Sequence, residues 1–417
     1  MRKIVIEGGR ELSGTIKISG AKNSAVALIP AAILSDEEVT IYNVPNISDR
    51  DALIDIIKLL EGEAKLDDDC LRLNMKNIKN KVIPEELSKK LRASYYFMGA
   101  LLGKYKKVEM YFPGGCNIGA RPINLHLKGF EMLGAKVTID CDKYTIEAEE
   151  LKGARIYLDF ASVGATINLM LAAVKAKGTT IISNAAREAE IVNIATFLNN
   201  MGAKITGAGT SEIKIVGVEH LGKAIIEVIP DRIEAGTYII MGALLGKDLA
   251  IDGVIKEHVD ALLSKLSDIG VKYEIRNNII TINRCADMKP INVKTLVFPG
   301  FPTDLGQPMS VLLTQCNGTS LFEETIWENR MGHTTHLNNM GANIKVSGSN
   351  AVIIGPTKLT GTDVTATDLR AGAAMVVAGL IAEGETRIAD IEHILRGYEN
   401  IIEKLQNVGA KIEIKEI

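Results

Sequence analysis

The sequence predicts an α/β protein built from six copies of one unit, with the order helix, strand, helix, strand and strand, and with three copies in each of two domains. Two short sequence markers support this fold class, because each occurs six times at intervals of 66–75 residues. Two independent markers with one period indicate an internal repeat. The length of 417 residues also exceeds what one hydrophobic core usually supports, which favours two domains.

The two markers punctuate each copy at equivalent places. The first is typically an apolar residue, Gly, a small residue, Lys or Asn, and an apolar residue, as in residues 201–205. Its glycines are Gly62, Gly134, Gly202, Gly270, Gly341 and Gly409. The second marker is the turn that ends a small, apolar helix. These turns lie at Asp36, Gly103, Gly178, Gly246, Gly318 and Gly384.

The third copy illustrates the elements of the unit in order. Residues 162–177 are rich in Ala, Leu and Met and predict a buried helix that ends at a glycine. Residues 179–182 are mostly β-branched and predict a strand. Residues 190–201 have the spacing of an amphipathic helix. Two further short strands are expected over 203–207 and 212–216.

The sixth copy ends one strand short, whereas two strands, over 3–7 and 14–19, are in surplus at the N-terminus. We therefore expect the start of the chain to pair into the domain of the last copy. This arrangement predicts one domain over 21–229 and a second over 1–20 and 230–417. A cleft between the two domains is the expected ligand site.

Composition excludes several classes of function. A formal net charge of -3 and a pI near 6.2 argue against a general nucleic-acid or membrane binder. The sequence has no apolar run of 18 residues, so no membrane-spanning helix is expected. Five cysteines without CxxC spacing fit a reducing cytoplasm and argue against a disulfide frame. No metal is expected, because His333 and His336 lack further candidate ligands nearby.

Polar residues gather at two equivalent positions of the repeat. At the start of the buried helix stand Lys22, Asn23, Arg92, Ser162, Asp231, Arg232, Asp304, Asp368 and Arg370. In the loop after the first strand stand Cys116, Arg121, Arg187, Glu188, Arg330 and Arg396. Helix N-termini with basic side chains favour anions, so we expect an enzyme that acts on a small polyanion. The alternative is helix capping and surface ion pairs, above all for Asp231 and Arg232.

The loop over 113–121 carries three glycines, one thiol and one arginine. A thiol reacts as the thiolate, and a nearby guanidinium lowers the pKa of a cysteine. Cys116 is therefore a candidate proton donor, with one carboxylate as the candidate base. The alternative is an ordinary glycine loop with an inert cysteine.

Nine motifs, spread in order along nearly the whole chain, resemble those of the UDP-N-acetylglucosamine 1-carboxyvinyltransferase family of enolpyruvyl transferases. They are Lys22-Asn23, residues 113–116 with 118–122, residues 162–166, 184–188, 230–234, 301–304, 328–330, 367–370 and 396–399. The resemblance implies two domains of three inverse α/β units each, in a barrel-like arrangement. It also implies the transfer of an enolpyruvyl group from phosphoenolpyruvate to the sugar 3-hydroxyl of UDP-N-acetylglucosamine, the first committed step of peptidoglycan precursor synthesis. No cofactor is implied.

The resemblance also implies a role for each site residue. Lys22, Arg121 and Arg396 would hold the phosphate of phosphoenolpyruvate, and Arg330 and Arg370 its carboxylate. Asp304 would take the proton of the attacking hydroxyl, and Cys116 would donate a proton and react with the epoxide fosfomycin. Arg92 would help to close the loop, and Asn23 would contact the tetrahedral intermediate. The nucleotide would contact Arg121, Pro122, Ile123, Asn124, Leu125, Ser162, Val163, Gly164 and Ile326.

Two positions depart from a common pattern of the family: Phe160 stands where Lys is frequent, and Asn124 where Asp is frequent. These departures concern the uridine contacts implied by the resemblance and not the chemistry. One alternative is the sister transferase that acts on shikimate phosphate, whose loop lacks the Gly-Gly-Cys pattern. Another is a non-catalytic or RNA terminal phosphate cyclase relative, which would require a basic face.

Overall fold

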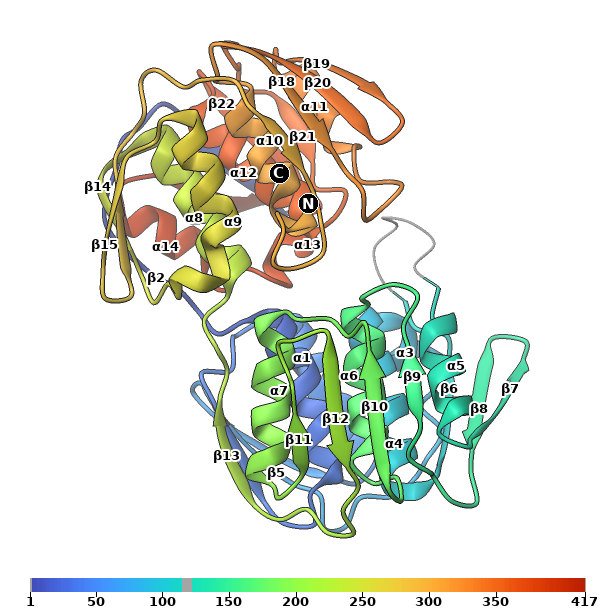
Figure 1. Cartoon of the computed structure of the whole chain (residues 1–417). Coiled ribbons are helices and arrows are strands. Elements are labelled where there is room, and N and C mark those ends of the chain that lie inside the picture. The colour runs from blue at the N-terminus through green and yellow to red at the C-terminus, as the bar shows by residue number, and fades with distance from the viewer. Residues whose placement is uncertain (1, 115–121, 417) are drawn as a thin grey trace. The chain divides into compact units, whose positions relative to one another are not determined.

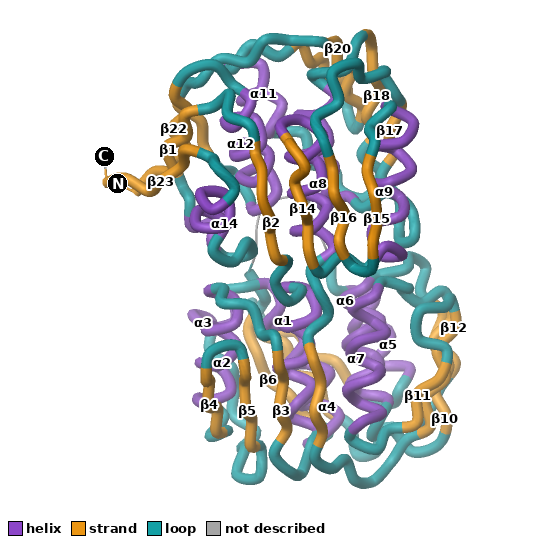
Figure 2. Tube along the Cα trace, turned by 90° about the vertical axis from the view of Figure 1, so that its left-hand side faces the viewer, coloured by secondary structure: helices purple, strands orange, loops and turns teal. Residues whose placement is uncertain are grey.

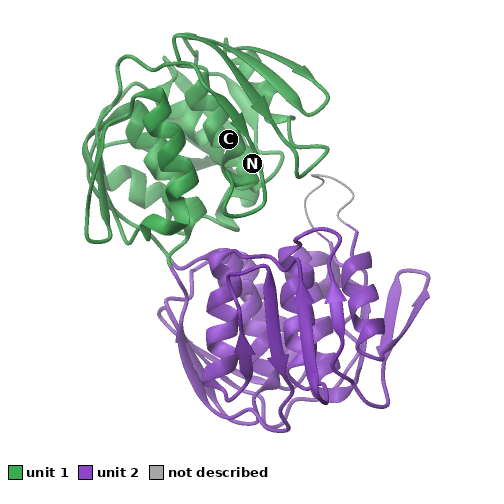
Figure 3. Cartoon of the chain, viewed as in Figure 1, with its two compact units in different colours: residues 1–19, 117–120, 230–417 green, residues 20–116, 121–229 purple. Residues whose placement is uncertain are grey.

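The computed structural model describes residues 2–114 and 122–416, which form two compact units (Figure 3). One unit contains residues 2–19 and 230–416, and the other contains residues 20–114 and 122–229. The sequence analysis placed Gly20 with the N-terminal strands, but it lies in the unit of residues 20–229. A Cβ on Gly20 would come within 1.9 Å of the carbonyl oxygen of Asn43, so Gly20 packs closely against another residue of this unit.

The unit of residues 20–229 contains three copies of the repeat (Figure 1). Its helices are α1 (Lys22–Ala31), η1 (Ala32–Leu34), α2 (Ser48–Leu59), α3 (Glu85–Lys90), η2 (Arg92–Tyr95), α4 (Tyr96–Tyr105), α5 (Asn124–Met132), α6 (Val163–Ala173) and α7 (Ala189–Asn200). Its strands are β3 (Val39–Tyr42), β4 (Glu63–Asp67), β5 (Cys70–Asn74), β6 (Lys107–Tyr111), β7 (Lys136–Asp140), β8 (Lys143–Glu147), β9 (Arg155–Tyr157), β10 (Thr179–Ser183), β11 (Lys204–Thr206), β12 (Glu212–Val216) and β13 (Ala224–Glu227).

The other unit contains three further copies. Its helices are α8 (Arg232–Leu245), α9 (Lys256–Ile269), η3 (Thr303–Leu305), α10 (Gly306–Leu313), α11 (His333–Asn339), α12 (Leu369–Ile381), α13 (Glu392–Leu395) and α14 (Ile401–Asn407). Its strands are β1 (Arg2–Glu7), β2 (Leu12–Lys17), β14 (Gly246–Asp252), β15 (Tyr273–Arg276), β16 (Ile279–Ile282), β17 (Asn292–Lys294), β18 (Gly318–Glu323), β19 (Asn343–Ser347), β20 (Asn350–Gly355), β21 (Asp363–Thr365), β22 (Glu385–Ala389) and β23 (Lys411–Glu416).

The first helix of each copy forms the core of its unit, and a small sheet and an amphipathic second helix cover it. Helix α4 contacts both α1 and α6 in one unit, and α8, α10 and α12 contact one another in the other. These helices are apolar around most of their circumference, as expected for helices surrounded by protein. Helix α6 ends at Ala173, earlier than expected, and the chain turns through Lys175 and Ala176 before Lys177 forms a parallel bridge with Lys152.

Four of the sheets contain a short strand that the sequence analysis did not predict, namely β9, β13, β17 or β21. In the described residues, five sheets have four strands and one has three. In each four-stranded sheet, the first strand after the buried helix of a copy has a parallel neighbour. In most copies this neighbour comes just before the buried helix, as β17 does beside β18. In the first copy it is β13, the last strand of the unit, which lies beside β3. Figure 2 shows one such sheet with β2, β14, β16 and β15 side by side.

The N-terminal strand completes the sheet of the sixth copy, as the sequence analysis expects. Strand β1 lies between β22 and β23 and is antiparallel to both. Ile4 pairs with Ile388 on one side and with Ile414 on the other. Ile4 and Ile6 are fully buried. Strand β2 then pairs in parallel with β14, so the start of the chain joins the last copy of this unit to its first.

Among the described residues, no helix combines the length and apolar character needed to cross a membrane.

Candidate active site

The carboxylate of Asp304 lies between two buried guanidinium groups. Asp304 is in η3, at the start of the buried helix of the fifth copy. Its Oδ1 accepts from Arg330 Nη2 at 2.7 Å, and its Oδ2 accepts from Arg370 Nη2 at 3.1 Å. The side chains of both arginines are 4% exposed, whereas that of Asp304 is 25% exposed. The group therefore presents a partly accessible carboxylate backed by two cations.

The two arginines determine the charge state of this carboxylate. Burial alone raises the pKa of Asp304, but the positive charges of Arg370 and Arg330 outweigh it and hold the pKa well below its usual range. Burial lowers the pKa of Arg370, and the facing Asp304 more than reverses that effect, so the pKa of Arg370 is raised. The guanidinium of Arg370 also lies 5.5 Å from the ring centre of the buried Tyr398. Asp304 and Arg370 are therefore both ionised at neutral pH.

The starts of three other buried helices show why Asp304 differs from its equivalents. Asp231 caps α8 and Asp368 caps α12, because each carboxylate accepts hydrogen bonds from two backbone N–H groups of the first turn. Ser162 caps α6 by accepting from the backbone N–H of Ala165 at 3.3 Å. The capping alternative is therefore correct for Asp231 and also accounts for Asp368 and Ser162. Asp304 accepts from arginines instead.

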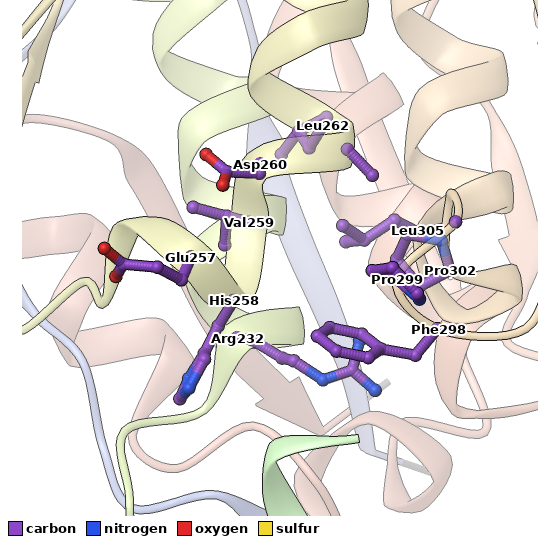
Figure 4. Close-up of a pocket in the computed structure, with 12 residues that line it drawn as sticks. Arg232, Glu257, His258, Val259, Asp260, Leu262, Phe298, Pro299, Pro302 and Leu305 are labelled. Carbon is purple, nitrogen blue, oxygen red and sulfur yellow. The ribbon is translucent and has the colours of Figure 1, made fainter. Parts of the chain in front are cut away.

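A pocket lies beside the segment that carries Asp304 (Figure 4). It is lined by Pro302 and Leu305 on that segment, by the start of α9 and by the turn at Phe298. The guanidinium of Arg232 lies 5.5 Å from the ring centre of Phe298. Arg232 thus packs against an aromatic ring, and its charge also helps to lower the pKa of Asp304. The sequence analysis did not identify Phe298, because its contact with Arg232 spans 66 residues of chain.

In the other unit, Lys22 begins α1 and forms an ion pair with Asp49 at the start of α2. The distance from Lys22 Nζ to Asp49 Oδ2 is 2.9 Å, and both side chains are largely buried. Asn23 follows Lys22 in the first turn of α1 and is partly exposed. Asp49 was not among the expected site residues. It lies at the start of the second helix of its copy, where a negative charge interacts favourably with the helix dipole.

Three of the expected segments meet around Tyr95 and His126. The guanidinium of Arg92 lies 5.8 Å from the ring centre of Tyr95, which packs edge-on against His126. A Cβ on Gly164 would come within 2.6 Å of the Tyr95 hydroxyl, so only glycine fits there without displacing the ring. His126 Nδ1 lies 2.9 Å from the amide nitrogen of Asn168. Arg92, the start of α5 and the start of α6 are thereby brought together.

The remaining expected residues are dispersed over both units. Pro122 and Asn124 are exposed, Leu125, Val163 and Ile326 are partly exposed, and Ile123 is buried. Arg396 follows α13 and is partly exposed. Cys116 and Arg121 lie outside the described residues. Among the residues that are described, no group of three or more His, Cys, Asp or Glu side chains could hold a metal ion.

The comparisons with known proteins agree on one family. The model of the family described as EPSP synthase (3-phosphoshikimate 1-carboxyvinyltransferase) matches residues 6–405. A Listeria monocytogenes protein named UDP-N-acetylglucosamine 1-carboxyvinyltransferase 2 is 52% identical, over 98% of this chain and 97% of its own. The chain belongs to the enolpyruvyl transferase family. A Geobacillus kaustophilus protein with the same name is 53% identical, over 99% of this chain and 96% of its own.

Solved structures of enolpyruvyl transferases share the fold. NikO from Streptomyces tendae superposes with a TM-score of 0.91 at 24% identity and covers 99% of both chains. EPSP synthase from Acinetobacter baumannii superposes with a TM-score of 0.76 at 17% identity and covers 100% of both chains. The two-domain α/β fold expected from the repeats is thus confirmed.

His126 should stay neutral well below the ordinary pKa of histidine. Burial, assisted by the charge of Arg92, lowers the pKa of His126 to about 3. The unfolded chain binds this proton at about pH 6.5 and the folded chain does not, so the free energy of unfolding falls as the pH drops below 6.5. At pH 5.5 this single group costs about 1.4 kcal/mol.

NMR of protein labelled with [13C]histidine, with the signal assigned by His126→Gln, measures this pKa directly. The His126 signal should stay constant from pH 8 to pH 5. The urea-unfolded protein is the control, in which the same residue should titrate near pH 6.5. A midpoint near 6.5 in the folded protein would contradict the burial argument.

Proposed function

We propose that this chain transfers the enolpyruvyl group of phosphoenolpyruvate to the 3-hydroxyl of UDP-N-acetylglucosamine and releases phosphate, as the first committed step of peptidoglycan precursor synthesis. The observation that carries the proposal is the 52% identity, over nearly the full chain, to a protein named for this reaction. The Asp304 site supports it independently, because it offers the charges that the reaction needs. We place the reaction in the cytoplasm, on the evidence of five cysteines without CxxC spacing.

The Asp304 group is suited to a substrate carboxylate. Two arginines and one aspartate leave a net charge of +1, and an arginine fork binds a carboxylate with two parallel hydrogen bonds. We assign the phosphoenolpyruvate carboxylate to Arg330 and Arg370. A second carboxylate beside these arginines would share their charge and raise the pKa of Asp304, as neighbouring like charges do. Substrate binding would thereby make Asp304 a stronger base at the moment of reaction.

The chemistry then follows in two steps. Asp304 accepts the proton of the 3-hydroxyl while that oxygen bonds to carbon 2 of phosphoenolpyruvate, and Cys116 gives a proton to carbon 3. The tetrahedral product carries both the sugar oxygen and the phosphate on carbon 2. In the second step the Cys116 thiolate takes a proton back from carbon 3, the double bond to carbon 2 forms again, and the bond between carbon 2 and the phosphate oxygen breaks, so that phosphate leaves with that electron pair. The electrons balance without a cofactor.

The other assignments also extend the family resemblance. We assign the phosphate to Lys22, Arg121 and Arg396, and the closing of the loop to Arg92. Asn23 would contact the tetrahedral intermediate. The nucleotide would contact residues 121–125, residues 162–164 and Ile326. The clustering of Arg92 with the starts of α5 and α6 supports a shared role for these segments in nucleotide binding.

A comparison of acceptors tests the proposed reaction. With phosphoenolpyruvate present, phosphate release should require UDP-N-acetylglucosamine, and shikimate 3-phosphate should not replace it. The second acceptor is included because the matching family model is described by the shikimate enzyme. The Asp304→Asn variant should lose at least about a hundredfold in kcat, since removal of a general base costs roughly that much. Phosphate release with shikimate 3-phosphate alone would overturn the assignment of the acceptor.

The role of Cys116 is tested by its reactivity toward fosfomycin. One equivalent should add to Cys116, and faster with UDP-N-acetylglucosamine present. Burial raises the pKa of Cys316 to about 12, which disfavours its thiolate. Cys141 is exposed, so Cys141→Ser is the matched control and should leave the labelling unchanged. Cys116→Asp should retain activity at lower pH and resist fosfomycin, because a carboxyl carries a proton but does not open the epoxide as a thiolate does. Mass mapping that places the adduct on Cys141 would refute the assignment.

A further inference from the structure

Glu324 is a buried carboxylate close to the Asp304 group, and neither the sequence motifs nor the proposed mechanism assigns it a role. It follows β18 directly and is 3% exposed. Both of its carboxylate oxygens accept hydrogen bonds. Oε1 accepts from the backbone N–H groups of Ile326 at 2.8 Å and Trp327 at 3.2 Å, and from the Thr295 hydroxyl at 2.9 Å. Oε2 accepts from the Thr303 hydroxyl at 2.7 Å.

The Thr303 hydroxyl connects Glu324 to the site. Arg330 Nη1 donates to Thr303 Oγ1 at 2.8 Å, while its other terminal nitrogen, Nη2, donates to Asp304. A guanidinium can only donate, so Thr303 must use a lone pair for Arg330. Its single hydroxyl hydrogen is then left for Glu324. The direction of the chain from Arg330 through Thr303 to Glu324 is therefore fixed by the chemistry of its two ends.

Glu324 thus joins three segments that are distant in sequence. Through Thr295 it holds the strand that precedes the turn at Phe298, and through Thr303 it holds the residue before Asp304. Its two backbone contacts fix the loop that leads from β18 to Arg330. Buried hydrogen-bond networks of this kind have one low-energy arrangement, because each unmade bond leaves a buried polar group unsatisfied.

We propose that Glu324 is a positioning residue that, through the Thr303 hydroxyl, holds the Arg330 guanidinium against Asp304. Its effect on turnover rests on the proposed enolpyruvyl transfer, whereas its effect on Arg330 does not. Because Arg330 acts together with Arg370 and Arg232 to keep Asp304 ionised, a loosened Arg330 raises the pKa of Asp304.

The Glu324→Gln variant tests this role with almost no change in volume. Two backbone N–H groups face the Oε1 position, so the new amide must place its oxygen there and its NH2 toward Thr303. That NH2 donates to the Thr303 oxygen, competes with Arg330, and leaves the hydroxyl hydrogen without an acceptor. We expect kcat/KM to fall about tenfold to a hundredfold. The loss should deepen as the pH is lowered, because the acidic limb of the profile moves to higher pH when the pKa of Asp304 rises.

Glu323→Gln is the matched control. It makes the same chemical change one residue earlier, at a partly exposed side chain that pairs with Lys294 at 3.0 Å. It should leave both kcat/KM and the pH profile unchanged. Thr303→Val removes the connecting hydroxyl and should reproduce the Glu324→Gln profile, whereas Thr303→Ser keeps the hydroxyl and should restore the wild-type profile. If Glu324→Gln does not fold, the comparison of Thr303→Val with Thr303→Ser tests the positioning role in its place.

NMR of the [15N]arginine-labelled protein provides a measurement that needs no substrate. With both terminal nitrogens held, the Arg330 guanidinium should rotate slowly in the wild type and in Glu323→Gln, and faster in Glu324→Gln. A wild type that forms no product with either acceptor would overturn the proposed function and leave this spectrum to decide the role of Glu324. A wild-type Arg330 spectrum together with a wild-type pH profile in folded Glu324→Gln would overturn the positioning role.

Discussion

The ion pairs of Asp304 with Arg330 and Arg370 are the interaction on which the rest of the candidate site depends. Arginine does not lose its proton in proteins, so two guanidinium groups that are 4% exposed need a nearby negative charge. Asp304 supplies it and ties together three separate parts of one unit: η3, the loop after β18 and the start of α12. Removing the carboxylate would leave two buried cations facing each other.

The same ion pairs keep Asp304 in the ionised state that a base needs but also lower its basicity, and the proposed reaction accounts for both effects. A carboxylate held ionised by two cations is in the correct state to accept a proton, but it is a weak base. A substrate carboxylate that engages Arg330 and Arg370 would weaken their hold on Asp304. The base would therefore gain strength only when the substrate is in place. Glu324 fits this account because, through Thr303, it holds the Arg330 guanidinium in one place. The substrate carboxylate and Asp304 then share a guanidinium of fixed position.

The sequence predicted the parts of the structure that repeat or that depend on local chemistry. Glycines at a fixed period indicated six copies, and the missing last strand indicated that β1 completes the final sheet. The three-residue strands β17 and β21 were missed because they are too short to show an alternating pattern. The role of Glu324 was missed for another reason. Its contacts with Thr295 and Thr303 cross more than 20 residues of chain, and its sequence neighbour Glu323 looks equivalent but lies in the strand.

The ionisation of Asp304 tests the central claim most directly. In protein labelled with [13C]aspartate, with the signal assigned by Asp304→Asn, the carboxylate of a ligand-free sample can be followed from pH 8 to pH 4. An ordinary aspartate is about half protonated at the acidic end of this range. We expect the Asp304 signal to remain that of the ionised form throughout. A titration midpoint at or above pH 4 would show that Arg330 and Arg370 do not control this carboxylate.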